Sequence, residues 1–531
     1  LPLTLSAAYL AYVFRLADGT PGRAGLGDWL DPYFINYVLE HWYYSVTTFS
    51  DPRSPLMFFP VPDTLGYSHS LILYAPFYIA ARLFLDPFQA YSLTIAIVML
   101  LGTVCLYLLL RQAGLHLLDS LLLTAFFATS GNVINSMTNT WTQTASVFLI
   151  PPALLLLGTA VRMAPGRARK TLAFAGGLLG GLVFSQEYYT GAFAALIVLL
   201  LVGLPALVSR GAREFTRAFR RFIVSLVQTV QAPAGPPGHP SVIWLVISGV
   251  FVIVAVALFI HPIDRTEIGS FRFSARDPWR PLYIAILAAL WFASQRWRLP
   301  ARLGRVAHAV PGAIAAPVDA LVRALQVRIP QVDARFLLAI LTGFAVSVVV
   351  FLTIYLGSFL EHRSFPVQDL LGQLREVHPS SWVNAETFFS DVNGFYSLRP
   401  FLFAMVVGAL ALIFLRADST ARRYVLWFLF VSLLVMIAPL RIGNFSPWRL
   451  VFGWWPGLSV IRSAARLIYL YELAVVLVTA FLIMRAASRV PWRIAVAASV
   501  VLLLLTDWNS WTFEYHRPRY FFQEWVLGRV E

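Results

Sequence analysis

The chain has little of several residue types, and each shortage excludes a class of chemistry. Its 531 residues include one cysteine, Cys105, which excludes an intrachain disulfide and a cysteine metal site. Lys170 is the only lysine, so no other lysine can form a Schiff base. Zinc-binding spacings, phosphate-binding glycine loops and nucleotide fingerprints are absent at usable spacing. The arginine bias indicates GC-rich coding and hence a bacterial source.

Charge is also scarce, while apolar residues are abundant. Hydrophobic residues make up 59% of the chain and charged residues 13%, with a mean hydropathy of +0.71. This composition excludes an ordinary soluble fold and predicts an all-α polytopic membrane protein of about 13 transmembrane helices. The predicted spans lie near 1–16, 88–110, 117–136, 144–161, 171–185, 190–208, 241–260, 281–295, 336–357, 400–415, 424–440, 467–484 and 494–506. The first run is short for a span, so we expect residues upstream of Leu1 and no cleaved signal peptide.

The net charge of +15 is explained by topology. Alternate breaks between the spans, here called the basic segments, hold 23 basic and five acidic residues; they lie around 111, 162–170, 210–221, 296–335, 416–423 and 485–493. The intervening segments hold 18 basic and 20 acidic residues, and Glu472 lies inside a span. By the positive-inside rule the basic segments are cytoplasmic and the C-terminus lies outside, in a bacterial inner membrane. The charge therefore gives no support to nucleic-acid binding and indicates contact with membrane lipid.

We treat the chain as one transmembrane domain with three notable segments. Residues 17–87 form a long first outer loop, 296–335 a basic amphipathic cytoplasmic segment, and 358–399 a second outer loop. The apolar stretch 71–85 is predicted to be a helix lying in or dipping into the outer face, because a span there would invert the charge alternation. The glycines from Gly176 to Gly181 predict close helix packing.

Two carboxylates stand directly after the first apolar run, in Gly27-Asp28-Trp29-Leu30-Asp31-Pro32. One interpretation is that Asp28 or Asp31 caps the helix that follows. The other is that a catalytic carboxylate faces a membrane-embedded substrate.

Two further motifs lie between apolar runs. Glu187, Tyr188 and Tyr189 form either a hairpin turn with interfacial tyrosines or the wall of a wet cavity, because a glutamate against lipid is costly. Arg462 and Arg466 share one helix face and suit a phosphate or pyrophosphate. The alternatives for these arginines are lipid headgroups or pairing with Glu472.

These motifs resemble the GT-C membrane glycosyltransferases, and most closely large, uncharacterised bacterial members. The resemblance rests on the Asp28 segment, Thr64-Leu65-Gly66-Tyr67-Ser68-His69, Glu187-Tyr188-Tyr189 and the segment from Pro456 to Arg466. More distantly, it extends to protein O-mannosyltransferases and lipid A aminoarabinose transferases. The adjacent Asp-Glu pair of mannosyltransferases and the Trp-Trp-Asp signature of oligosaccharyltransferases are absent, because Pro456 follows Trp454-Trp455.

The resemblance implies a GT-C-like fold and transfer of a sugar from a polyprenyl-phosphate-linked donor to an acceptor on the outer face. Asp28 would be the general base or orient the acceptor, with Asp31 as the second catalytic carboxylate. The implied substrate-binding residues are His69, Glu187, Tyr188, Tyr189, Arg449, Arg462 and Arg466. No cofactor is assigned and a divalent metal ion stays open, as do partner subunits. Two other functions stay open: a transporter or flippase of a lipid-linked glycan, and a non-catalytic structural subunit of a larger membrane complex.

Overall fold

The structure is a computed structural model that divides into two compact units, and each unit is described by itself. Unit 1 comprises residues 1–205 and 335–531, and unit 2 comprises residues 206–334. The structure describes residues 25–26, 31–56, 62–129, 132, 134, 142–203, 248–251, 254, 263–268, 271–275, 285, 288, 333–362, 383–384, 399–414, 419–441, 447, 466–485, 493–494, 496–501 and 515–516. The predicted first span, 1–16, lies outside these residues.

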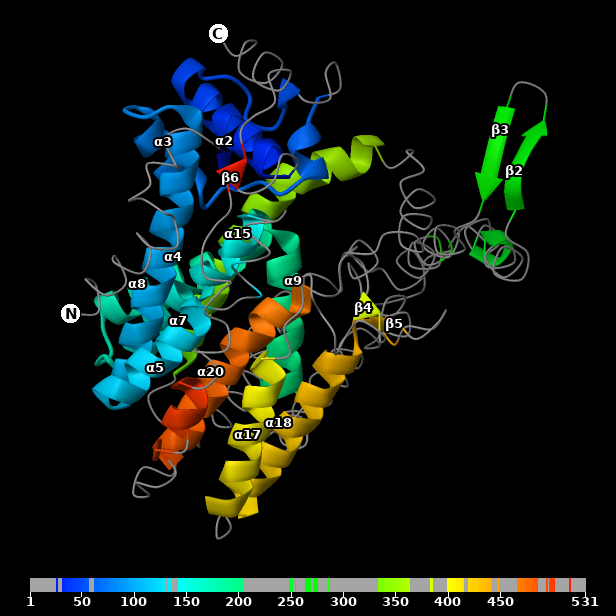
Figure 1. Cartoon of the computed structure of the whole chain (residues 1–531). Coiled ribbons are helices and arrows are strands. Elements are labelled where there is room, and N and C mark those ends of the chain that lie inside the picture. The colour runs from blue at the N-terminus through cyan, green and yellow to red at the C-terminus, as the bar shows by residue number, and fades with distance from the viewer. Residues whose placement is uncertain are drawn as a thin grey trace, which may run out of the picture. The chain divides into compact units, whose positions relative to one another are not determined.

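The first outer loop folds into short helices in unit 1 (Figure 1). Helix α2 (Asp31–Thr48) begins at Asp31 and is followed by the 3-10 turn η4 (Thr64–Tyr67) and by α3 (Ala75–Arg82). The stretch 71–85 is therefore helical in part, as predicted. Because α3 has 8 residues, it extends only about 12 Å, which is too short to cross a bilayer.

Long apolar helices follow the first loop. Asp86 caps α4 (Pro87–Gln112) by accepting from the backbone N–H groups of Phe88 at 2.8 Å and Gln89 at 3.0 Å, and Pro87 occupies the first turn. The next elements are α5 (Leu117–Ala128), η5 (Thr142–Leu149), α7 (Ile150–Arg162), α8 (Arg167–Gln186), α9 (Tyr188–Val198) and the π-turn η6 (Leu199–Gly203). The later helices are α15 (Ala334–His362), α17 (Arg399–Phe414), α18 (Ser419–Ile437) and α20 (Leu467–Arg485).

The predicted apolar runs 88–110, 171–185, 336–357 and 467–484 are confirmed as helices, whereas the run 424–440 is helical only as far as Ile437 and ends in β5. Among the described residues, four helices are long and apolar enough to cross a membrane: Pro87–Gln112, Gln143–Arg162, Ala334–Leu356 and Leu467–Arg485. Shorter apolar helices cover Leu117–Ala128, Tyr188–Leu201 and Arg399–Phe414. The number of about 13 spans stays a prediction, because several of the predicted spans lie wholly or partly outside the described residues.

Glycines of α8 let two helices approach it closely, as the sequence predicted. A Cβ at Gly176 would lie 2.7 Å from the Leu157 side chain of α7. A Cβ at Gly177 would lie 2.3 Å from the Ile340 carbonyl oxygen of α15. Gly180 differs, because a Cβ there would meet no atom within 4 Å. Small-residue contact is a typical way for membrane helices to pack.

Several long-range contacts in unit 1 join two helix ends that both lie near basic segments, or two helix ends that both lie near intervening segments. Near the basic segments, Arg493 pairs with Asp119 at 2.7 Å, and the Tyr424 hydroxyl donates to the Leu201 carbonyl at 2.8 Å. Near the intervening segments, the buried Arg399 guanidinium donates to the carbonyls of Phe126 and Thr129 at the end of α5. This grouping agrees with the charge alternation along the sequence, and which group faces the cytoplasm stays a prediction.

The described part of the chain also contains short strands, which the all-α prediction did not include. In unit 1, β1 (Gly25–Leu26) pairs antiparallel with β6 (Tyr515–His516), and β4 (Val383–Asn384) pairs in parallel with β5 (Leu440–Arg441). Both pairs join intervening segments. In unit 2, β2 (Ile263–Ile268) and β3 (Phe271–Ala275) form a hairpin. The two-residue strands of unit 1 are too short to carry a periodic apolar signal, so the sequence did not reveal them.

Candidate functional site

A single residue, Glu187, separates α8 from α9. Its backbone is extended, with φ −152° and ψ 109°. The Glu187 N–H donates to the Val183 carbonyl at 3.1 Å and its carbonyl accepts from the Gly191 N–H at 3.2 Å, so it closes one helix and opens the next. Gly191 makes this tight turn feasible, because a Cβ there would lie 2.4 Å from the Phe184 ring. The predicted hairpin turn is therefore reduced to one residue.

The Glu187 side chain is buried and ion-paired. Its Oε1 lies 3.4 Å from Nη1 of Arg466, and Oε2 accepts a hydrogen bond from the Thr190 hydroxyl. The exposed fractions of the two charged side chains are 1% and 9%, so neither faces lipid or bulk water. Burial raises the pKa of Glu187 from 4.5 to about 7, even though Arg466 and Thr190 favour the ionised form. This carboxyl group can therefore exchange a proton near neutral pH.

The partner of Arg466 corrects one of the sequence-based alternatives. Pairing with Glu472 was considered, because both residues lie near the start of α20. The structure instead pairs Arg466 with Glu187, and Glu472 is fully buried within α20. The Arg466 guanidinium also lies 4.7 Å above the ring of Tyr189, which adds a cation–π contact.

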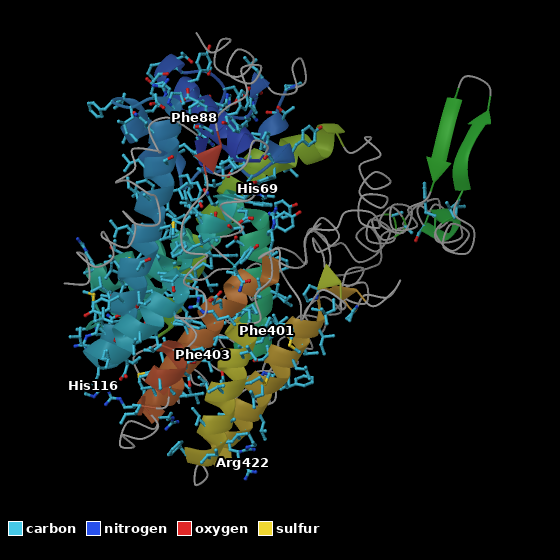
Figure 2. All side chains as sticks on the ribbon, in the orientation of Figure 1. His69, Phe88, His116, Phe401, Phe403 and Arg422 are labelled. Carbon is cyan, nitrogen blue, oxygen red and sulfur yellow. The ribbon has the colours of Figure 1, made fainter. Side chains whose placement is uncertain are left out.

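Three aromatic rings lie beside this ion pair. Tyr188 and Tyr189 are stacked with centroids 4.4 Å apart, and the His69 ring lies 5.5 Å from Tyr188 and 5.8 Å from Tyr189. Tyr189 is buried, whereas Tyr188 and His69 are half-buried. Figure 2 labels His69 beside α15 and apart from Phe401 and Phe403 of α17. Tyr189 is thus packed inside the protein, and Tyr188 is packed there in part.

The loop that carries His69 is hydrogen-bonded to the end of α8. The Leu71 N–H donates to the Gln186 carbonyl at 3.3 Å, and the Leu73 N–H donates to the Gln186 side chain at 2.7 Å. The hydroxyl of Tyr74 lies 3.2 Å from that of Ser146 in η5. The first outer loop therefore lies directly against the Glu187 turn.

We call this group of side chains the Glu187 cluster; it consists of Glu187, Arg466, Thr190, Tyr188, Tyr189 and His69. Five of its members were predicted as substrate-binding residues from three separate motifs, and the fold brings them together. Thr190 was not predicted, because a threonine inside an apolar run gives no signal of its partner. The predicted Asp28, Arg449 and Arg462 lie outside the described residues, and Asp31 is described only as the first residue of α2.

A second buried carboxylate lies elsewhere in the first outer loop. Glu40 of α2 accepts from Arg82 Nε at 2.7 Å and from the Tyr78 hydroxyl, and that hydroxyl also lies 3.0 Å from the side-chain oxygen of Asn36. All of these contacts join α2 to α3, so this group holds the loop's two helices together. Nothing in the sequence distinguished Glu40 from the other acidic residues.

The described residues do not offer a metal site. In this part of the chain, no three His, Cys, Asp or Glu side chains gather closely enough to hold an ion. A divalent metal ion therefore stays open, and no step proposed below passes through a metal.

Comparisons with known proteins give only a distant likeness. No family profile and no curated protein matches the chain. The solved structures that align with it are of the Archaeoglobus fulgidus oligosaccharyltransferase. One, tethered to an acceptor peptide, gives a TM-score of 0.38 at 14% identity over 97% of this chain and 55% of that chain. Another, in complex with an inhibitory peptide and a dolichol-phosphate, gives a TM-score of 0.36 at 14% identity over 99% of this chain and 53% of that chain.

A third structure of the same protein, in complex with Zn and sulfate, gives a TM-score of 0.34 at 13% identity over 97% of this chain and 54% of that chain. The chain thus spans about half the length of the proteins with which it aligns. TM-scores of this size do not establish a shared fold, so the chemistry of the site rests on its own residues.

Proposed function

We propose that the chain is a bacterial membrane glycosyltransferase that moves a sugar from a polyprenyl-phosphate-linked donor to an acceptor on the outer face. The observation that carries the proposal is the convergence of His69, Glu187, Tyr188, Tyr189 and Arg466 on one cluster. All of them belong to intervening segments, which the positive-inside rule places outside. A buried ion pair beside half-buried aromatic rings is typical of a binding site more than of lipid-facing surface.

The cluster suggests a division of roles. His69 and Tyr188, being half-buried, are the groups that a ligand can reach, and aromatic rings suit the apolar face of a sugar. Glu187 and Arg466 hold each other and Tyr189 in place beneath them. Arg462 and Arg449 would then bind the donor phosphate, because guanidinium groups form strong charge-assisted hydrogen bonds with phosphate oxygens. Asp28 would deprotonate or orient the acceptor hydroxyl.

The test is transfer by the purified full chain in lipid vesicles. A polyprenyl-phosphate-linked hexose labelled in the sugar is supplied, and the release of polyprenyl phosphate and the movement of label to added hydroxyl acceptors are measured. The proposal expects bond cleavage that depends on the protein. Movement of intact donor between leaflets without cleavage would identify a flippase, and neither event would favour a structural subunit.

A matched pair of arginine variants separates the site from general stability. Arg466→Ala and Arg493→Ala each remove the cation of a largely buried ion pair, with Glu187 and Asp119 respectively. Only the first pair belongs to the Glu187 cluster. We expect Arg466→Ala to lower transfer by about 10²-fold or more, the usual effect of removing a positioned charged group, and Arg493→Ala to leave it within about twofold. Equal losses in the two variants would contradict the assignment of the site.

A further inference from the structure

Ser70, next to His69 in the chain, is fully buried, and each of its polar groups bonds to a different helix. Its N–H donates to the hydroxyl of Tyr355 in α15 at 3.2 Å, and its own hydroxyl donates to the Ser185 carbonyl at the end of α8. Its carbonyl accepts from Nε1 of Trp42 in α2 at 2.6 Å. Ser70 is therefore the point at which three helices, distant in the sequence, are joined.

Tyr355 closes this arrangement. Its hydroxyl accepts from the Ser70 N–H and donates to the Ser185 carbonyl at 3.0 Å, so that Ser70, Tyr355 and Ser185 form a closed ring of hydrogen bonds. Such buried networks fix their members more firmly than isolated bonds do. Little else of α15 is buried: of an apolar stretch of 18 residues in this helix, only 17% is buried inside the protein. Tyr355 is thus a specific link between α15 and the His69 loop.

The backbone beside Ser70 is strained. Leu71 has a φ of 55°, a left-handed conformation that costs a non-glycine residue about 1–2 kcal/mol. Its side chain is completely buried and its N–H is held by the Gln186 carbonyl. Residues keep such conformations only where their surroundings over-determine them, and such places often lie at functional sites.

We propose that Ser70, held by Tyr355 and Trp42, is a positioning residue that fixes the His69 ring against Tyr188 and Tyr189 above the Glu187–Arg466 pair. The assignment of a ligand-facing role to His69 rests on the proposed function. The positioning itself rests on the hydrogen bonds of Ser70 and on the ring contacts of its neighbour. Without these bonds the His69 loop would lose its fixed distance from the turn at Glu187, and the ring would sample other orientations.

Removing one hydroxyl tests the proposal with a matched control. Tyr355→Phe deletes the hydroxyl that accepts from the Ser70 N–H and donates to the Ser185 carbonyl, and it leaves the bond from the Ser70 hydroxyl to the Ser185 carbonyl in place. Tyr424→Phe deletes a hydroxyl that donates to the Leu201 carbonyl at 2.8 Å, near a basic segment and away from the cluster. Trp42→Phe and Trp427→Phe form a second pair, because Trp427 donates to the Leu200 carbonyl at 2.8 Å.

The first readout does not depend on any enzymatic activity. The full chain in lipid vesicles is treated with diethylpyrocarbonate, and the modification of His69 is followed by peptide mass mapping. We expect the rate to rise about threefold to tenfold in Tyr355→Phe and in Trp42→Phe, the change that a lost hydrogen bond produces. It should stay at the wild-type value in Tyr424→Phe and Trp427→Phe. Equal rates in all four variants would overturn the proposal.

The second readout separates positioning from loss of folded protein. If Tyr355 acts through His69, the KM for the labelled donor should rise about threefold to tenfold in Tyr355→Phe, whereas partial unfolding lowers the maximal rate and leaves KM unchanged. A faster modification of His69 with an unchanged KM would overturn the ligand-facing role of His69. If the wild-type chain transfers no sugar, the proposed function fails, and the modification rates alone decide whether Ser70 positions His69.

Discussion

The Glu187–Arg466 pair yields a sharp prediction, because its two members differ in whether they can lose their charge. At the observed 3.4 Å, two unit charges attract by about 5 kcal/mol at an effective dielectric constant of 20. Removing one partner of a buried pair usually destabilises a protein by about 3–5 kcal/mol, because the other charge is left without compensation. The size of the loss should therefore depend on what the remaining group can do.

Glu187→Gln leaves the Arg466 guanidinium buried, and arginine stays charged at every practical pH. We expect this variant to lose about 3–5 kcal/mol of unfolding free energy at pH 6 and less at pH 8, because wild-type stability falls as Glu187 ionises. The variant has no carboxyl group at this position, so its own stability should depend little on pH. The glutamine amide can still accept from Thr190, so the loss reflects the ion pair and not that hydrogen bond.

Arg466→Met leaves Glu187, which can neutralise itself by binding a proton. Burial already raises its pKa to about 7, and loss of the guanidinium removes the strongest influence that lowers it. A raised folded-state pKa means that the contribution to stability is complete below the unfolded value of 4.5 and is lost as pH rises through the folded value. Wild-type stability should thus fall between about pH 4.5 and about pH 7, and in Arg466→Met the fall should extend above pH 7.

The measurement is unfolding in mixed micelles of increasing SDS content, followed by the fluorescence of the 16 tryptophans. The double variant Glu187→Gln with Arg466→Met completes a cycle, and its loss should be smaller than the sum of the single losses by about 1–3 kcal/mol. Single variants within about 1 kcal/mol of wild type, or an Arg466→Met loss that is the same at pH 6 and pH 8, would refute this reasoning.

Three further outcomes are expected. Asp28→Asn should keep the fold and lower transfer by about 10²–10⁴-fold, as measured with the labelled donor, while Asp31→Asn should cost about 1 kcal/mol of stability if Asp31 caps α2; the reverse pattern would mean that the wrong carboxylate was assigned. A cysteine at Gln231, on a cysteine-free background, should react with an impermeant maleimide only after cells are opened, and labelling of intact cells would contradict the orientation. Gly177→Ala should lower stability by about 1–3 kcal/mol, because its Cβ would lie 2.3 Å from a carbonyl oxygen of α15, whereas Gly180→Ala should be neutral or slightly stabilising; similar thermal shifts would argue against close packing.

The sequence by itself determined the local elements and the candidates for the site. Long apolar runs specify membrane helices because every buried backbone group must be bonded within its own segment, and α4, α15 and α20 fall where those runs predict them. Where a charged residue interrupts such runs, as Glu187 does, its charge must be compensated by a partner group or by water. Chemistry therefore singled out Glu187 and Arg466, and the family resemblance added His69.

Only the tertiary structure decided which of these residues meet. Arg466 lies six residues from Glu472, yet it pairs with Glu187, which is 279 residues earlier in the chain. Such a choice depends on how α20 packs against α9, and no local pattern records that packing. For the same reason Ser70 gave no signal: a serine in a loop becomes informative only when three distant helices bring their hydrogen-bonding groups to it. Apolar periodicity is a property of neighbours in the sequence, whereas a site is made by neighbours in space.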